Sequence, residues 1–164
     1  MWEYKGIRRN LLGGRINYSA RTVIVPNAKL RSYEIGLPYV CFVELYKEVI
    51  INLLVKLDGY SYSEAVNKWY SAYRAFDEKI YKIIKYILKH ADPKVLLNRN
   101  PTINFGSFLC MNVAYVKKDY NDLSCDLPIQ SLAALNADFD GRSMLTYLAI
   151  SLSILACYKS DLTV

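Results

Sequence analysis

Two aspartates separated by one position, Asp138 and Asp140, are the residues with the clearest capacity for chemistry. In an extended backbone alternate side chains point to the same side, so both carboxylates would face one way while Phe139 faces the core. Two carboxylates this close repel each other unless a cation lies between them. Hard, anionic oxygen donors select Mg²⁺ rather than zinc or copper. Nucleotidyl or phosphoryl transfer needs a magnesium ion held in this way.

The spacing of the two aspartates also has a simpler interpretation. Ordinary polar turns often contain acidic residues at alternate positions. Taken alone, the pair is more typical of such a turn than of a metal site. Other features of the chain are needed to distinguish a polar turn from a metal site.

The elements that would position the pair follow an α+β order. The β-branched run Thr22–Val25 predicts a strand, and apolar residues at helical spacing predict a helix from Pro38 to Asp58. Ser61 and Glu64 form a capping-box pattern that opens a second helix. Further strands are expected at 95–97, 111–116 and from 144, with 117–126 as a polar connector. This order indicates a β core with a helical insertion at about residues 38–92.

The charged residues are unevenly distributed along the chain. Residues 1–31 contain seven of the 21 Lys and Arg residues but only one of the 15 acids, so the remainder is neutral. A basic terminus of this kind suggests a polyanionic partner, nucleic acid before membrane, although a solvated terminus has the same composition. In the helical block, Lys79, Lys82, Lys85 and Lys89 are interpreted as a solvated helix face rather than a binding patch.

The cysteines and the apolar runs narrow the class of protein. The four cysteines are scattered without a C-x-x-C pair, which argues against a zinc site and a disulfide scaffold and fits a reducing compartment. No secretory signal is visible. The longest uncharged apolar run, 143–158, is shorter than the roughly 20 residues needed to span a bilayer. We therefore expect a cytoplasmic location and no membrane partner.

Four segments resemble, in order, the motifs of the largest (β′-type) subunit of multisubunit DNA-dependent RNA polymerases. The family's opening segment is similar to 11–24 here, and its Gly-Leu-Pro element to 36–38. Its Leu-Asn-Arg-x-Pro motif is similar to 97–101, and its acidic loop to 136–141, which reads Asn-Ala-Asp-Phe-Asp-Gly. Together they span residues 8 to about 150.

The resemblance implies a barrel fold and a bound magnesium ion. In this family these segments build one of two double-psi β-barrels whose interface forms the active site, the second barrel belonging to the other large subunit. We therefore expect an α+β double-psi β-barrel with a helical insertion, forming a single domain over residues 1–164. By the same resemblance, Asp138 and Asp140 would be the catalytic ligands of Mg²⁺.

The resemblance also implies contacts to nucleotides and nucleic acid. Arg99 and Asn136, with Pro101 of the same motif as Arg99, would lie at the incoming nucleoside triphosphate. A guanidinium and a carboxamide can both bond the 2′-hydroxyl that marks RNA. The alternatives are a surface salt bridge for Arg99 and a turn-stabilising role for Asn136. Arg8, Arg15 and Arg21 match positions that contact phosphates of the template DNA or the RNA–DNA hybrid, since Arg binds phosphate bidentately.

One position departs from the family pattern in a way that bears on catalysis. The family's third aspartate is replaced by Arg142. Alternation would direct this cation to the side of Asp138 and Asp140, where it opposes magnesium binding. Three explanations stay open: a catalytically disabled relative, a rearranged loop with Arg142 pointing away, or an altered residue in an otherwise active polymerase.

The function that follows is that of one component of a larger enzyme. We expect a subunit of a DNA-directed RNA polymerase, a nucleotidyltransferase that works with the second large subunit and the remainder of the largest one. The alternative is a disabled scaffold or a nucleic-acid-binding module within such an assembly. A short, divergent chain of this kind resembles the split subunits of large bacteriophages, which would place it in the host cytoplasm or the virion.

Overall fold

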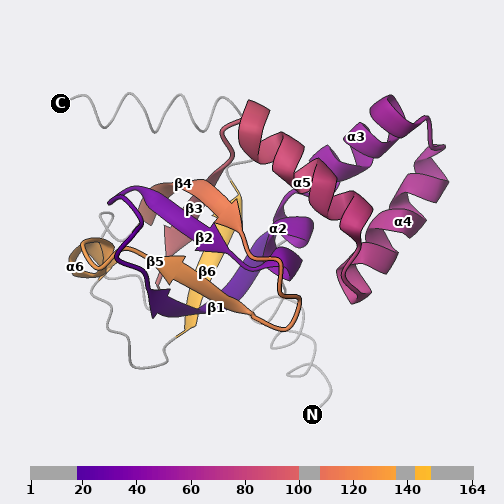
Figure 1. The fold of residues 1–164 in the computed structure, drawn as a ribbon. Coiled ribbons are helices and arrows are strands. Elements are labelled where there is room, and N and C mark those ends of the chain that lie inside the picture. The colour runs from indigo at the N-terminus through magenta and orange to yellow at the C-terminus, as the bar shows by residue number, and fades with distance from the viewer. Residues whose placement is uncertain (1–17, 100–107, 136–142, 149–164) are drawn as a thin grey trace, which may run out of the picture.

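The barrel at the centre of the molecule is built from six strands. The computed structural model describes residues 18–99, 108–135 and, as backbone, 143–148. The strands are β1 (Ser19–Pro26), β2 (Glu34–Leu37), β3 (Lys94–Asn98), β4 (Phe108–Val116), β5 (Ser124–Leu127) and β6 (Ser143–Leu148). They close in the order β1-β5-β2-β4-β3-β6 (Figure 1).

Two of the six strand pairings are parallel and the others antiparallel. β1 runs parallel to β5, and β2 runs parallel to β4. The connection from β2 to β4 contains the whole helical block and β3, as parallel neighbours require a long crossover. The predicted α+β double-psi β-barrel with a helical insertion at about 38–92 is confirmed.

Buried and exposed residues alternate along β1 and β5. On β1 Thr22 and Ile24 are buried, whereas Val23 and Val25 are exposed. On β5 Cys125 and Leu127 are buried, whereas the polar Ser124 and Asp126 are only partly buried. In these two strands every second residue therefore faces the barrel interior.

The helical insertion lies to one side of the barrel (Figure 1). Its helices are α2 (Tyr39–Leu45), α3 (Lys47–Asp58), α4 (Tyr62–Arg74) and α5 (Glu78–His90); α6 (Ser131–Leu135) follows β5. The capping box at the start of α4 is confirmed, because Ser61 and Glu64 each bond the backbone N–H of the other. The apolar stripe of α5 is buried at Ile80, Ile83, Ile84 and Ile87. Trp69 donates from Nε1 to the Val43 carbonyl oxygen at 2.9 Å and so ties α4 to α2.

The single helix predicted from Pro38 to Asp58 is wrong, because the structure divides it at Tyr46. Tyr46 has φ −101° and ψ 24°, outside helical values. Its ring stacks on the Phe42 ring, with the two ring centroids 4.4 Å apart, and its hydroxyl donates to the Lys94 carbonyl oxygen at 2.9 Å. Packing onto β3 therefore overrides the continuous helical periodicity.

The prediction that 117–126 is only a polar connector is also wrong. Its last residues begin β5, which pairs with β1 and β2. Asp126 looks unsuited to a strand in the sequence, but on the outer face its carboxylate lies 2.7 Å from the Lys117 ammonium.

None of the helices in the described part of the chain has both the length and the apolar character that a membrane crossing requires.

Candidate functional site

The two aspartates predicted to bind magnesium lie in a segment bounded by two described elements. α6 ends at Leu135 and β6 begins at Ser143, so 136–142 joins the two. β6 is hydrogen-bonded on both sides, with Ser143 opposite Val23 of β1 and Leu145 opposite Asn98 of β3. Seven residues singled out in the sequence lie outside the described part of the chain: Arg8, Arg15, Pro101, Asn136, Asp138, Asp140 and Arg142.

Arg99 occupies the position where β3 leaves the barrel. It directly follows Asn98, the last residue of β3, which is opposite Leu145 near the start of β6. Val95 and Leu97 are fully buried, so alternation gives Arg99 the same inward parity. The side chain is only 9% exposed. The alternative of an ordinary surface salt bridge does not fit a residue buried to this extent.

The Arg99 guanidinium has an unmet hydrogen-bonding requirement. Its Nε atom is buried and has no hydrogen-bond partner within the described residues. A guanidinium stays charged at any pH a protein tolerates, and a buried charged donor without an acceptor is unfavourable. Arg99 is therefore a charged donor near the start of β6, and its Nε has no acceptor among the described residues. It could accommodate a hydroxyl or a phosphate oxygen.

Arg21 lies on the opposite side of β6 from Arg99. It is in β1 directly opposite Leu145, and its side chain is exposed on the outer face, with the parity of Val23 and Val25. The start of β6 thus has Arg21 beside it on β1 and the buried Arg99 beside it just after the end of β3. Of the predicted site residues, these two are the ones that the described part of the chain places, on the two sides of β6.

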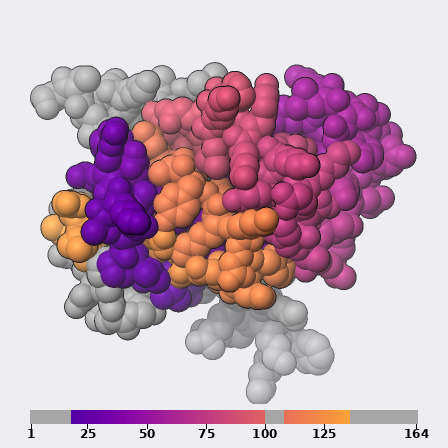
Figure 2. All heavy atoms as spheres, in the orientation of Figure 1, coloured from indigo at the N-terminus to yellow at the C-terminus, as the bar shows by residue number. Residues whose placement is uncertain are grey.

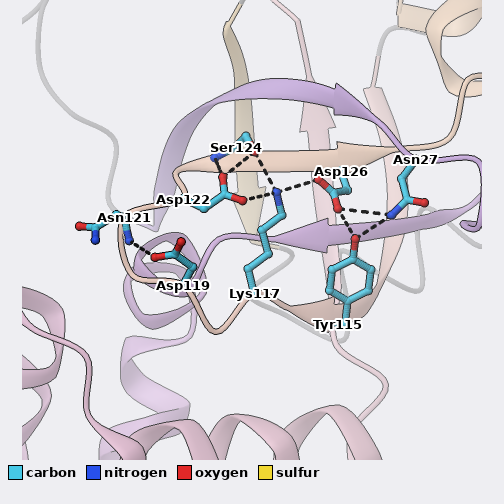
Figure 3. Close-up of polar contacts among 8 residues, drawn as sticks. All are labelled: Asn27, Tyr115, Lys117, Asp119, Asn121, Asp122, Ser124 and Asp126. Atoms are coloured by element: carbon cyan, nitrogen blue, oxygen red, sulfur yellow. Dashed lines mark hydrogen bonds and ion pairs between the residues drawn. The ribbon is translucent and has the colours of Figure 1, made fainter.

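A second polar site, on the outer face of the barrel, was not identified from the sequence. Tyr115 of β4 donates from its hydroxyl to a carboxylate oxygen of Asp126 on β5, and Asn27 donates from Nδ2 to the Tyr115 hydroxyl oxygen at 2.9 Å (Figure 3). Asn27 follows β1 directly. This cluster therefore ties together the ends of strands far apart in the sequence.

Lys117 extends the cluster into a charged network. Its ammonium lies 2.7 Å from Asp126, 2.9 Å from Asp122 and 2.8 Å from the Ser124 hydroxyl, as Figure 3 shows. Three donors thus meet three acceptors, and the lysine side chain is only 13% exposed. Alternation puts 122, 124 and 126 on one side of an extended chain, which was the one signal of the network in the sequence.

The electrostatics of the network follow from its partners. The Ser124 hydroxyl and the Lys117 ammonium lower the pKa of Asp122 to about 2. Burial alone would lower the pKa of Lys117, but hydrogen bonds to Asp126 and Asp122 outweigh it and raise that pKa. Burial and the Asp126 carboxylate raise the pKa of Tyr115 to about 12. One ammonium thus lies between two carboxylates and is hydrogen-bonded to both, an arrangement that suits a structural role more than catalysis.

Gly36 permits this network because the Tyr115 ring lies across it. Gly36 is opposite both Tyr115 and Asp126 in the barrel. A Cβ atom at Gly36 would lie only 2.5 Å from Cζ of the Tyr115 ring. Any larger residue would displace the ring from Asp126. The glycine of the Gly-Leu-Pro element is thus explained by a close approach of side chain to backbone.

Comparison with known proteins gives a consistent set of similarities. Residues 13–70 match the family described as RNA polymerase Rpb1, domain 2. The DNA-directed RNA polymerase subunit beta' of Bacteroides fragilis is 36% identical over 147 residues, covering 88% of this chain and 10% of that subunit. The corresponding subunits of Bifidobacterium animalis subsp. lactis and Fusobacterium nucleatum subsp. nucleatum are each 33% identical over 88% of this chain. The chain spans about a tenth of the length of these relatives.

The close approach at Gly36 predicts a specific coupling with Tyr115. Gly36→Ala should destabilise the protein by about 2 kcal/mol, because the Tyr115 ring must leave its hydrogen bonds. In a Tyr115→Ala background the same substitution should cost well under about 1 kcal/mol. Urea unfolding of the two single variants and the double variant measures the coupling. Additive effects would contradict this account of Gly36.

The charged network predicts a pH-dependent loss of stability in Lys117→Met. Asp122 has a folded pKa of about 2 against an ordinary value of 3.8, so its contribution is complete above pH 3.8 and is lost as the pH falls towards 2. The variant should unfold about 3 kcal/mol more easily at neutral pH, because two carboxylates lose their cation.

This difference from the unaltered protein should shrink in acid, as Asp122 becomes protonated between pH 3.8 and about 2. Denaturant unfolding between pH 2.5 and 7 measures it. Lys118→Met is the matched control, since Lys118 is 66% exposed and the Glu78 with which it forms an ion pair is also exposed. A deficit in Lys117→Met that does not change with pH would argue against the network.

Proposed function

We propose that this chain forms the part of a DNA-directed RNA polymerase that carries the acidic loop of the active centre. The chain belongs to the family of the β′-type subunits of that enzyme. The family is established by relatives 33–36% identical over 88% of the chain. The observation that carries the proposal is Arg99, a buried cation beside the strand that follows residues 136–142.

The donor set proposed for the metal is Asp138 and Asp140. Carboxylate oxygens are the ligands that Mg²⁺ prefers, so these residues fit the ion in type. When bound, magnesium would stabilise the charge that develops on the oxygens of the phosphoryl group being transferred. The two aspartates would neutralise and orient the ion, and β6 would fix one end of the loop that carries them.

Nucleotide and nucleic-acid contacts are proposed for the basic and amide side chains. Arg99 would donate from its buried guanidinium to the incoming nucleoside triphosphate, with Asn136 and Pro101 completing that side of the site. Arg21, exposed on β1, would bind a phosphate of the template or the RNA–DNA hybrid, together with Arg8 and Arg15. Arg99, directly after β3, and Arg21 on β1 would then lie on the two sides of β6, the first available to the nucleotide and the second to a nucleic-acid phosphate.

Arg142 favours a second candidate function. A fixed cation in place of the family's third aspartate opposes a bound metal and could itself neutralise Asp138 and Asp140. The barrel would then serve as a non-catalytic scaffold or nucleic-acid-binding module within the same polymerase. Both candidates require the second large subunit and the rest of the largest one, because this chain spans a tenth of its relatives.

Magnesium binding separates the two candidates. In the purified polymerase complex, Arg142→Asp should tighten Mg²⁺ binding at least about tenfold, because an anionic ligand replaces a cation. Isothermal titration calorimetry measures the affinity, with Lys56→Asp as a control of equal charge change at an exposed position. Measurable binding to the unaltered complex, weakened by Asp140→Asn, supports the catalytic role.

Restoration of binding only by Arg142→Asp supports the scaffold. If neither the unaltered complex nor Arg142→Asp binds magnesium at this site, the assignment of Asp138 and Asp140 is wrong.

Arg99 should set the preference for ribonucleotides. Arg99→Leu should reduce the ratio of ATP to dATP affinity of the complex about tenfold, because a charged hydrogen bond to the sugar is lost. Equilibrium binding of fluorescent analogues of the two nucleotides measures the ratio. Arg74→Leu, an exposed residue on α4, is the control. An unchanged ratio would remove Arg99 from the nucleotide site.

A further inference from the structure

The outward surface of α5 is defined by the way this helix packs. Its buried residues, Ile80, Ile83, Ile84 and Ile87, fix the rotation of the helix about its axis. At about 100° per residue, the side chains at 82, 85, 86 and 89 then fall within an arc of about 100° on the opposite side. All four are exposed. We call Lys82, Lys85, Tyr86, Lys89 and the adjoining His90 the α5 face.

The α5 face carries positive charge that the described residues do not neutralise. Lys82 and Lys85 are three residues apart and Lys85 and Lys89 four apart, spacings at which like charges on a helix repel. None of the three forms an ion pair within the described part of the chain, and Lys85 contacts only the Tyr81 ring, at 4.9 Å.

The acids at the two ends of the helix have other partners. Glu78 pairs with Lys118 at 3.6 Å, and Asp92 with Lys94 at 3.8 Å. Lys79, on the same helix but nearer its start, is paired with Asp58 at 3.2 Å. The uncompensated charge is therefore confined to the α5 face, where it extends about 10 Å along the helix axis.

Two aromatic rings lie beside these lysines. Tyr86 is 46% exposed although it is a large ring on a well-packed helix. The His90 ring packs on it with centroids 4.3 Å apart, and His90 Nδ1 lies 2.9 Å from the Tyr86 carbonyl oxygen. The pair thus presents a supported aromatic surface next to three cations. The helix lies at the surface of the molecule, in pink in Figure 2.

We propose that the α5 face binds a single-stranded nucleic acid. The lysines would neutralise successive phosphates, and a base would stack on Tyr86. A solvated helix face accounts for the lysines but not for an exposed, ring-supported tyrosine among them. A membrane surface is disfavoured because the apolar arc of α5 is already buried. RNA and displaced single-stranded DNA share this chemistry. The proposal does not depend on the acidic loop.

The first test measures the charge contribution. Fluorescence anisotropy of the full chain with a labelled 15-nucleotide oligo-U RNA gives the dissociation constant from 50 to 300 mM salt. Lys82→Gln/Lys85→Gln/Lys89→Gln should weaken binding at least about tenfold and reduce the slope of log K against log salt by about 2. Lys89→Gln alone should weaken binding more than Lys56→Gln, a lysine likewise in the last turn of its helix.

The second test measures the stacking contribution. Tyr86→Ala should weaken binding to the single strand at least about fivefold, and Tyr86→Phe should retain most of it, because the ring and not the hydroxyl stacks. Tyr62→Ala is the matched control, since Tyr62 is 62% exposed on α4. A 15-base-pair duplex should be insensitive to Tyr86→Ala, because its bases are already stacked on each other.

A parallel series with oligo-dT separates the two sources of the strand. Preference for oligo-U assigns the face to RNA, and equal or tighter oligo-dT binding assigns it to single-stranded DNA.

Binding of the triple lysine variant within twofold of the unaltered chain would overturn the proposal. So would a triple variant that loses binding to phosphatidylserine vesicles while keeping RNA. Loss of binding in Tyr62→Ala equal to that in Tyr86→Ala would remove the stacking role.

Discussion

Barrel closure by β6 is the constraint on which the candidate site depends. β6 is antiparallel to both β1 and β3 and is the last strand of the closed order. Its backbone groups bond two strands that lie far apart in the sequence. The first residues of β6 therefore have a fixed position relative to Arg21, which lies opposite Leu145 on β1, and to Asn98, which directly precedes Arg99.

The part of the barrel formed by β1, β5, β2 and β4 is held by a different interaction. There a charged network spans the ends of β1, β4 and β5, and a glycine on β2 lets the Tyr115 ring cross to Asp126. Lys117 is mostly buried, so its three partners have to be in place for it to be stable there. Because the parallel neighbours β1 and β5 lie far apart in the sequence, the hydrogen bonds from Asn27 to Asp126 and Tyr115 supply a restraint that a hairpin turn would otherwise give.

The sequence predicted elements that depend on local pattern and missed those that depend on distant contacts. The β1 strand, the Ser61 capping box and the isoleucine stripe of α5 follow from residues within one turn or strand, and all are confirmed. The break at Tyr46 depends on the Lys94 carbonyl, and the place of Asp126 in β5 depends on Lys117 and Tyr115. Of the predicted site residues, Arg99 gains a buried setting that spacing could not reveal, and the roles of Asp138 and Asp140 stay predictions.

The α5 face is a second case in which contacts between distant residues add to what the local sequence pattern indicates. From the sequence, four lysines on a helix are most simply a solvated surface. Two facts of packing change that interpretation: Lys79 is already neutralised by Asp58, whereas the other three stand together with Tyr86 on one arc. Net charge therefore describes this chain poorly, since the +6 lies entirely in residues 1–31, and the neutral remainder still carries a helix face whose three lysines have no ion pair within the described residues. Like charges held that close repel each other, and a bound polyanion relieves that repulsion without altering the fold.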